Sequence, residues 1–340
     1  MQDLVDELDL AIINCLQIRP RASWVHVGRV LEVDPVTVSR RWDRLVAQGL
    51  AWVTCFGHPN TNRVMAYIEV DVAGAHVHTV AEQVSSHPAV ASVHHTTGAR
   101  SLVLSVVGAD PVAISHYVSD HLGTVEGIVA TRSEMVTAIH GEASEWRLRT
   151  LSPSQRRALQ TAYPRPSAPA TTTAPSDDEY RIMQALATDG RMSTTDLARH
   201  LGVSEATARR RVNRLLGEGR AALRCEIAQE ISGSPHTGLL WARAPLDVLD
   251  NVARSLSELP EVRACLSITG RNNLMLFTWL RNVGDLQRIE RTVSGVAPEL
   301  EVTDRAFCLR SVKRLGRLID DRGRSAGVLP SATWEVETMP

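Results

Sequence analysis

The sequence predicts an α+β fold that is built twice along one chain. The first observation is a repeat at an offset of 170 residues, without a gap, in which Arg21-Ala22-Ser23 returns as Arg191-Met192-Ser193. The second is that each copy passes from helical to strand periodicity in the same order. A repeat this long indicates a duplicated domain rather than a solenoid, whose period is roughly 20–50 residues.

The repeat and the composition between its copies predict six segments. Residues 164–176 are rich in Pro, Thr and Ala and lack bulky apolar side chains, which favours an extended, semi-stiff connection. The predicted segments are a winged-type helix-turn-helix at 1–57, a βαββαβ domain at 58–145, a linker at 146–176, a second helix-turn-helix at 177–228, a second βαββαβ domain at 229–318 and a flexible tail at 319–340.

Composition indicates an ordinary globular protein. Of the 340 residues, 44% are hydrophobic and 22% charged, and no apolar stretch approaches the roughly 20 residues of a membrane span. The start of the chain lacks a basic region followed by an apolar run, so we expect no secretory signal and a cytoplasmic location. We expect neither a membrane association nor a cofactor.

The cysteines and histidines do not form a recognisable metal or disulfide pattern. The five cysteines are widely spread without a Cys-x-x-Cys pair, which argues against a disulfide framework or structural zinc. Cys55 and Cys225 occupy equivalent places where apolar strands begin, and we expect small buried residues there, with reactive thiols as the alternative. His76/His78 and His94/His95 have no further donors nearby in the sequence, so no metal site is predicted.

Each copy opens with two short helices. Leu8, Ile12 and Leu16 recur at helical spacing and form one apolar stripe over residues 7–18. Ser23 and Ser193 are favourable N-caps for a second helix. A break of a few residues then precedes a third helix in both copies.

The third helix has clear start and stop signals. Asp34-Pro35 combines an N-cap with proline at the first helical position, and Ser204-Glu205 serves the same purpose in the second copy. Gly49 and Gly219 end the two helices. Three helices with a roughly three-residue turn before the last follow the helix-turn-helix plan.

The polar face of this third helix predicts a contact with double-stranded DNA. In a helix-turn-helix the last helix enters the major groove, where Arg suits guanine and phosphate and Asn suits adenine. All but one of the 37 basic residues are Arg, yet their clustering at matched positions is not explained by that bias. A merely solvated helix face is the alternative. The predicted DNA-binding residues are Thr37, Ser39, Arg40, Arg41, Arg44, Thr207, Arg209, Arg210, Arg211, Asn213 and Arg214.

The second part of each copy reads as βαββαβ, which gives a ferredoxin-like sandwich. One face of such a sheet is covered by helices, and the other is apolar and must be buried elsewhere. In copy one the strands are expected near 64–70, 93–97, 102–107 and 128–136, with helices near 77–84 and 112–122. In copy two the last three elements are expected near 274–279, 283–293 and 302–309.

This order of elements resembles the leucine-responsive/asparagine regulator (Lrp/AsnC) family. The resemblance rests on the helix-turn-helix followed by βαββαβ, on Thr97-Gly98 and Thr269-Gly270, and on the closing strand at 309–313. It covers about 9–140 and 177–318, twice over. It implies a RAM/AsnC-type domain in each copy, sheets packed as an internal pseudo-dimer, DNA as a partner, further homo-oligomers and regulation of transcription in response to an amino acid or small carboxylate.

The resemblance also implies an effector site near the loop after each glycine. The family loop typically carries acidic residues, whereas the loops here do not, and an Arg there suits a carboxylate or phosphate instead. Solvated turn residues are the alternative. The predicted effector-binding residues are Gly98, Arg100, Gly270, Arg271, Asn272 and Asn273.

Two other functions compete with a transcription regulator. Tandem copies of this fold also resemble sirohaem decarboxylases, whose His-Asn-Tyr-x-Arg-like stretch has a loose counterpart in residues 94–100. Copy two has no His at the matching stretch 264–267, and both third helices keep full Arg faces, so we predict no enzyme. An effector-binding module without DNA binding is the third interpretation.

Overall fold

The chain forms two compact units, and each unit is assembled from both copies of the repeat. The computed structural model describes residues 5–57, 63–141, 146–162 and 175–329. One unit, here called the helix-turn-helix unit, comprises Met1–Asn62, Arg147–Ile231 and Arg324–Pro340. The other, called the sheet unit, comprises Arg63–Trp146 and Ser232–Gly323. Each unit therefore combines one predicted type of domain from both copies of the repeat.

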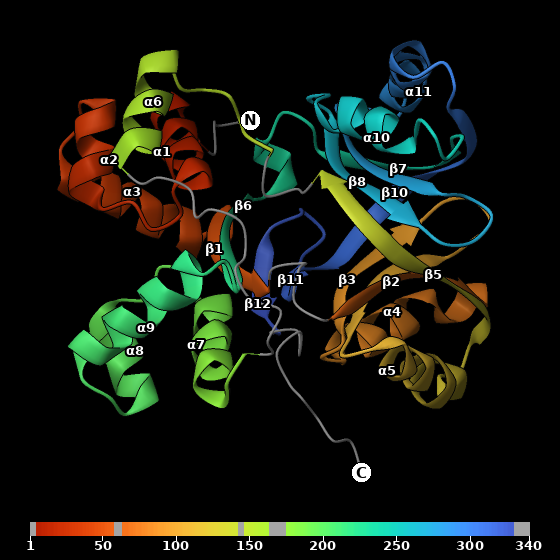
Figure 1. The fold of residues 1–340 in the computed structure, drawn as a ribbon, viewed down its shortest axis with the longest axis horizontal. Coiled ribbons are helices and arrows are strands. Elements are labelled where there is room, and N and C mark those ends of the chain that lie inside the picture. Colours follow the sequence, from red (N-terminus) through yellow and green to blue (C-terminus); the bar gives the residue numbers. More distant parts are fainter. Residues whose placement is uncertain (1–4, 58–62, 142–145, 163–174, 330–340) are drawn as a thin grey trace. The chain divides into compact units, whose positions relative to one another are not determined.

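The helix-turn-helix unit holds two trihelical bundles joined by a two-stranded sheet (Figure 1). Its elements are α1 (Glu7–Ile18), α2 (Trp24–Leu31), α3 (Pro35–Ala47), β1 (Ala51–Gly57), α6 (Pro153–Ala162), α7 (Asp177–Thr188), α8 (Thr194–Leu201), α9 (Glu205–Gly217), β6 (Ala221–Ile227), the 3-10 turn η4 (Gln229–Ile231) and β12 (Ser325–Val328).

The expected caps position the third helices. The Asp34 carboxylate accepts the backbone N–H of Val36 at 2.8 Å, and the Ser204 hydroxyl accepts that of Thr207 at 3.3 Å. Gly49 and Gly219 both adopt φ of +66°, a left-handed conformation that favours glycine after a helix. The N-cap and C-terminal predictions for α3 and α9 are confirmed.

The strands after the two helix-turn-helices pair with each other. β1 and β6 run antiparallel from the pair Ala51–Ile227 to the pair Gly57–Ala221. β1 also lies against α7 of the other copy, where the Thr54 hydroxyl donates to the Ala187 carbonyl at 3.0 Å. We expected a wing in each copy. Among the residues described, each copy instead has one strand after its helix-turn-helix, and the two strands pair with each other.

The predicted linker and tail are more ordered than expected. Residues 153–162 form α6, in which Leu159 is fully buried and Gln155 donates to the Val30 carbonyl at 3.2 Å. In the predicted tail, β12 is a strand, and Ser325 donates its N–H to the Gly49 carbonyl at 2.9 Å. Residues 163–174 and 330–340, where the linker and tail predictions also fall, lie outside the described residues.

The sheet unit contains the two βαββαβ domains. Copy one provides β2 (Val64–Val72), η1 (Gly74–His76), α4 (Val77–Ser86), β3 (Val90–Thr96), β4 (Leu102–Gly108), α5 (Pro111–His116) continued by a π turn (Tyr117–His121) and η3 (Leu122–Thr124), and β5 (Ile128–Gly141). Copy two provides β7 (His236–Arg243), α10 (Leu249–Ser257), β8 (Val262–Ile268), β9 (Leu274–Leu280), α11 (Asp285–Val296), β10 (Glu301–Arg314) and the short β11 (Arg317–Ile319).

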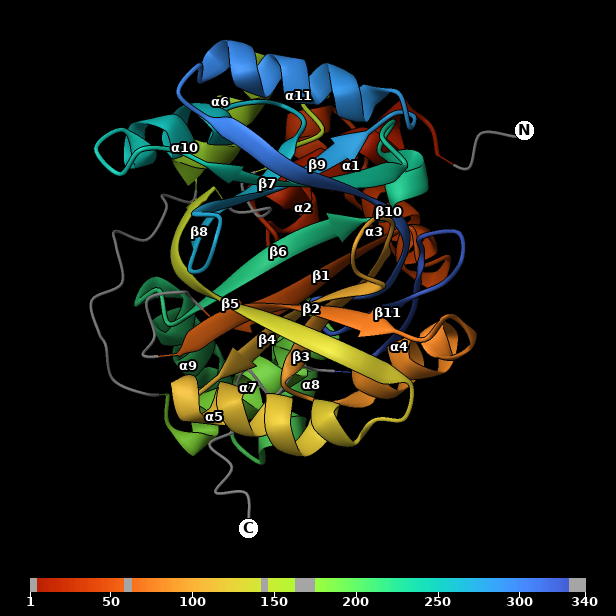
Figure 2. The ribbon, with the colours of Figure 1, turned by 90° about the vertical axis from the view of Figure 1, so that its right-hand side faces the viewer.

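The last strand of each copy is longer than predicted because its second half joins the sheet of the other copy. β5 pairs with β2 and then continues onto β8, where Val136 lies opposite Ile268 (Figure 2). β10 pairs with β7 and then with β3, where Ser311 lies opposite His94. The eight long strands therefore close into a continuous ring.

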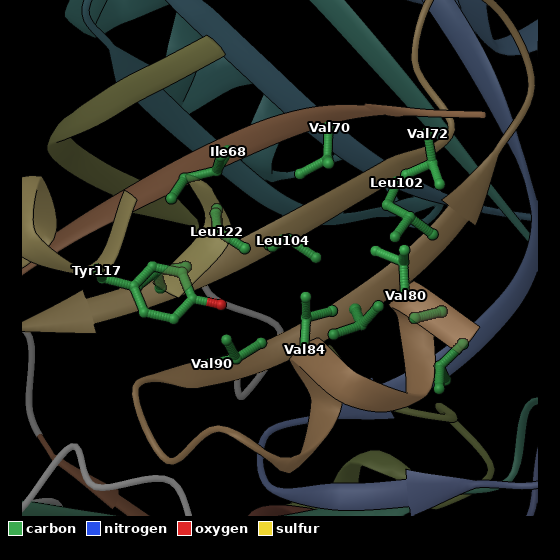
Figure 3. Close-up of a cluster of buried hydrophobic side chains, with 14 of the residues drawn as sticks. Ile68, Val70, Val72, Val80, Val84, Val90, Leu102, Leu104, Tyr117 and Leu122 are labelled. Atoms are coloured by element: carbon green, nitrogen blue, oxygen red, sulfur yellow. The ribbon is translucent and has the colours of Figure 1, made fainter. Parts of the chain in front are cut away.

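Each sheet buries one face against helices and the other against its counterpart. In copy one, Val80 and Val84 of α4 and Tyr117 point toward the strand residues Ile68 and Leu104 (Figure 3). A separate cluster draws on both copies, with Val103 beside Leu239, Trp241, Leu266, Ile268, Met275, Phe277, Ala306 and Cys308. The two apolar sheet faces are packed together within one chain.

All five cysteines are free and buried, which confirms the expectation of small buried residues at Cys55 and Cys225. Burial raises the pKa of Cys15 and Cys265 to about 12, so these thiols stay protonated at neutral pH. Within the described ranges, no three His, Cys, Asp or Glu side chains gather as a metal site. None of the helices described is long and apolar enough to span a membrane.

Candidate nucleic-acid interface

The outer stripe of each third helix is exposed. Val38, Trp42 and Leu45 of α3 are buried, and the helical repeat then directs Arg40 and Asp43 away from the core. On α9 the buried positions are Ala208, Val212 and Leu215. The stripe that we call the outer stripe consists of Val36, Arg40, Asp43 and Ala47 on α3 and Ala206, Arg210, Asn213 and Gly217 on α9, all exposed.

The arginines at the side of α3 are tied to acids of α1. Arg41 contacts the carboxylate of Asp6 at 2.6 Å and that of Asp9 at 3.0 Å. Arg44 forms an ion pair with the same Asp9, whose side chain is only 1% exposed. Hydrogen bonding to Arg41 lowers the pKa of Asp6. Arg41 and Arg44 therefore also hold α3 against α1.

Copy two repeats this arrangement with different acids. Arg211 contacts Asp178 at 2.8 Å, while Arg214 and Arg220 reach Glu179 at 3.4 Å and 2.9 Å. Burial opposes ionisation of Glu179, but hydrogen bonds from Ser176 and the charge of Arg220 outweigh it and lower its pKa.

The structure thus divides the predicted DNA-binding residues into two groups. Arg40, Arg209 and Arg210 are exposed and make no ion pair within the described part of the chain. The arginines at the side of each helix form ion pairs with acids of α1 and α7; they are Arg41, Arg44, Arg211 and Arg214. Thr37, Ser39 and Thr207 are half-buried. Sequence reasoning treated all the arginines as one face and missed Asp9 and Glu179. Asp9 and Glu179 are separated by the repeat offset, and two acids at equivalent positions were an available signal for a partner of these arginines.

Two half-buried arginines join the helix-turn-helices. Arg21 donates to the carbonyls of Gly190 and Met192 at 2.7 Å and 2.9 Å. Arg191 donates in return to the carbonyls of Pro20 and Ala22, at 2.5 Å and 2.9 Å. Burial and the nearby charge of Arg21 lower the pKa of Arg191 to about 10, so it remains protonated at neutral pH. The repeated Arg motif therefore links the turn after α1 to the turn after α7 and joins the two helix-turn-helices.

Among the described residues, several of the predicted effector residues are engaged with neighbouring parts of the protein. Gly98 and Gly270 have φ of +97° and +106°, as a tight turn requires. Arg100, only 6% exposed, lies 3.2 Å from Glu69, pairs with Asp304 and stacks 4.1 Å from the centre of the Trp241 ring. It joins the two sheets instead of facing solvent.

The loop of copy two offers fewer free groups than expected. Asn272 accepts a hydrogen bond from Thr303 at 2.6 Å, and Asn273 binds both the N–H and the carbonyl of Ala244. Arg271 is exposed and makes no hydrogen bond or ion pair with other described residues. Both amides are thus hydrogen-bonded to neighbouring residues, and the assignment of Asn272 and Asn273 to an effector site stays a prediction.

The histidine of the enzyme interpretation is also internal. His94 is buried, with Nδ1 3.1 Å from the Ser311 hydroxyl, and lies against Phe277. Burial lowers the pKa of His94 to about 4, so the ring is neutral at physiological pH. Neither His94 nor Arg100 is directed at solvent.

The fold and the outer stripe define a protein with two helix-turn-helices and two paired ferredoxin-like domains. The AsnC-type helix-turn-helix domain matches residues 5–46 and 179–216. The Lrp/AsnC ligand binding domain matches residues 65–145 and 241–318. The chain belongs to the Lrp/AsnC family and carries its two domains in tandem.

Similar proteins correspond to one copy each. An uncharacterised HTH-type transcriptional regulator of Pyrococcus horikoshii is 28% identical over 142 residues, 40% of this chain and 87% of that protein. The Bkd operon transcriptional regulator of Pseudomonas aeruginosa is 27% identical over 146 residues, 39% of this chain and 90% of the relative.

One solved structure is similar along almost the whole chain. The sirohaem decarboxylase NirDL superposes with a TM-score of 0.60 at 12% identity, covering 90% of this chain and 93% of its own. At this identity the similarity shows a shared tandem fold.

Proposed function

We propose that this protein is a sequence-specific DNA-binding transcription regulator whose helices α3 and α9 lie in the major groove of neighbouring half-sites. The observation that carries the proposal is the outer stripe, in which Arg40 and Arg210 are exposed at equivalent positions. The reciprocal hydrogen bonds of Arg21 and Arg191 support the proposal, since they join the two helix-turn-helices that carry α3 and α9. Such a regulator acts in the cytoplasm.

The test is the salt dependence of DNA binding. In the double variant Arg40→Ala/Arg210→Ala, we expect weaker binding and a log–log salt slope reduced by about 0.9 for each lost phosphate contact. The control Arg281→Ala/Arg291→Ala removes the same charge from exposed positions of the sheet unit. Anisotropy titrations at several salt concentrations measure both. Equal affinity and slope in wild type and the outer-stripe variant would contradict the proposal.

We further propose that the sheet unit binds a small anionic or zwitterionic effector, such as an amino acid or another small carboxylate. The match to a ligand binding domain and the exposed guanidinium of Arg271 support this. The two loops differ at Ala99/Arg271, Arg100/Asn272 and Ser101/Asn273, so we expect fewer ligands than domains. Calorimetry with an amino-acid panel tests it; two equivalent sites, or binding indifferent to Arg271→Ala, would argue against it.

A sirohaem decarboxylase-like enzyme is the second candidate, favoured by the whole-chain similarity to NirDL. The internal positions of His94 and Arg100 weigh against it, because both side chains are engaged with the protein itself. DNA retardation and porphyrin absorbance measured on one purified sample separate the two functions. A porphyrin spectrum without DNA retardation would favour the enzyme.

A further inference from the structure

We propose that the two recognition helices read different base pairs, so that this chain recognises an asymmetric DNA site. The inference rests on the proposed DNA binding and concerns its specificity. Its basis is the outer stripe, where one position is identical in the two copies and others are not.

The shared position is Arg40/Arg210 and the main difference is Asp43/Asn213. Arg40 and Asp43 lie three residues apart on the exposed stripe of α3. Arg210 and Asn213 have the same spacing on the exposed stripe of α9. Asp43 and Asn213 are exposed and form no hydrogen bond or ion pair with the side chains described. The charge of Asp43 acts on Arg191 of the other copy without a direct ion pair, so the polar groups of both Asp43 and Asn213 are available to a partner. The difference is therefore presented to whatever α3 and α9 bind.

The two side chains suit different bases. A carboxylate is only an acceptor, and in the major groove it pairs with the N4 amino group of cytosine. An amide is donor and acceptor at once, and it pairs with N6 and N7 of adenine. We infer that the half-site of copy one has cytosine where that of copy two has adenine. Arg40 and Arg210 are expected to contact the same guanine or phosphate position in both half-sites.

Two further differences between the copies also make the two recognition helices chemically unlike. Val36 is 75% exposed and suits a thymine methyl group, whereas its counterpart Ala206 is smaller. Arg209 replaces Ser39 and adds a positive charge beside the stripe of copy two. Copy two therefore contributes more to phosphate binding, because Asp43 repels the backbone where Asn213 does not.

Covalent duplication permits this asymmetry. In a homodimer both recognition helices are identical, so the preferred operator mirrors the two-fold axis. Here each helix has its own sequence while Arg21 and Arg191 keep the two in a common body. A mutation on α3 need not be matched on α9.

The experiment is selection of bound sequences from randomised duplex DNA with the full chain. Wild type is expected to select two half-sites that differ at the position contacted by Asp43 and Asn213. Asp43→Asn is expected to make them alike at that position by replacing cytosine with adenine, and Asn213→Asp by replacing adenine with cytosine. Each exchange should change the affinity for the original site by about tenfold. The control Asp247→Asn alters the same charge at an exposed position of the sheet unit.

The outcomes are distinguishable. A palindromic wild-type site would overturn the inference and leave DNA binding intact. So would an unchanged selection in both Asp43→Asn and Asn213→Asp, provided that thermal unfolding shows them folded. Absence of salt-dependent binding to any duplex would overturn the proposed function itself, and this inference with it.

Discussion

At the scale of single residues, the neighbours of an arginine decide what it can do. Arg40 and Arg44 lie one helical turn apart on α3, yet only Arg44 contacts the buried carboxylate of Asp9. A buried carboxylate that loses a partner costs stability, whereas an exposed arginine costs little to remove. The arginine proposed to contact DNA and the arginine that holds the helix against α1 are thus different members of one cluster.

This difference predicts unequal effects on stability. Arg44→Ala should lower the free energy of unfolding by about 1–3 kcal/mol, because Asp9 would lose one of its two arginines and keep only Arg41 and the backbone N–H of Asp6. Arg40→Ala should change it by less than about 0.5 kcal/mol. Urea denaturation of the two variants measures both. Equal stability would show that the Asp9 pair contributes nothing.

A second residue-scale prediction concerns Glu134. Burial and the charge of Glu69 raise its pKa from 4.5 to about 7. The folded protein therefore binds a proton between pH 4.5 and 7 that the unfolded chain releases, so stability falls as pH rises through this window. Glu134 is only half-buried, so solvent screening reduces the effect, and we expect a loss of about 1–2 kcal/mol from pH 5 to pH 8.

The matched variant isolates this titration. Glu134→Gln keeps the shape and an acceptor for the indole N–H of Trp241, which lies 3.3 Å from the carboxylate. Its thermal stability should vary less between pH 5 and pH 8 than that of wild type and should exceed wild type at pH 8. A parallel pH profile in both proteins would refute the raised pKa.

At the scale of elements, exchanged contacts join the copies in each unit. β1 pairs with β6, and β5 and β10 each finish in the other copy's sheet. Arg21 and Arg191 add four hydrogen bonds to backbone carbonyls between the helix-turn-helices. These contacts fix one helix-turn-helix relative to the other.

We expect Arg21→Ala/Arg191→Ala to destabilise the helix-turn-helix unit by about 1–3 kcal/mol for each arginine, since buried carbonyls lose their donors. Lysine at both positions should restore only part of this, because an ammonium lacks the planar fork that reaches two carbonyls. Thermal unfolding followed by circular dichroism compares the three proteins. Full rescue by lysine would mean that charge, not geometry, matters.

At the scale of the whole molecule, one chain supplies both halves of what would otherwise be a dimer. The cluster around Val103 and Trp241 combines apolar side chains from both sheets. Each sheet therefore depends on the other copy to cover its inner face.

A separated copy should not remain a stable monomer. A fragment of residues 60–145 would expose the inner sheet face and leave the second half of β5 without β8. We expect it to self-associate or aggregate in sedimentation velocity, whereas the full chain stays soluble. A monodisperse, folded monomer of this fragment would count against the pairing as the source of stability.

The sequence alone determined the duplicated plan, the helix caps and the element order, because these depend on periodicity and local hydrogen bonding. Ser152, Pro153 and Gln155 also carried a local start signal for α6, whose capping hydrogen bonds appear in the structure. That helix could have been predicted and was not.

Only the tertiary structure decided the remainder. The extension of β5 and β10, the pairing of β1 with β6 and the burial of Arg100 depend on segments that are distant in sequence. The same holds for the division between Arg40 and Arg44, since Asp9 approaches α3 only after α1 has packed. Periodicity shows which face of an element is apolar or charged, but the partner of that face is set by packing between distant segments.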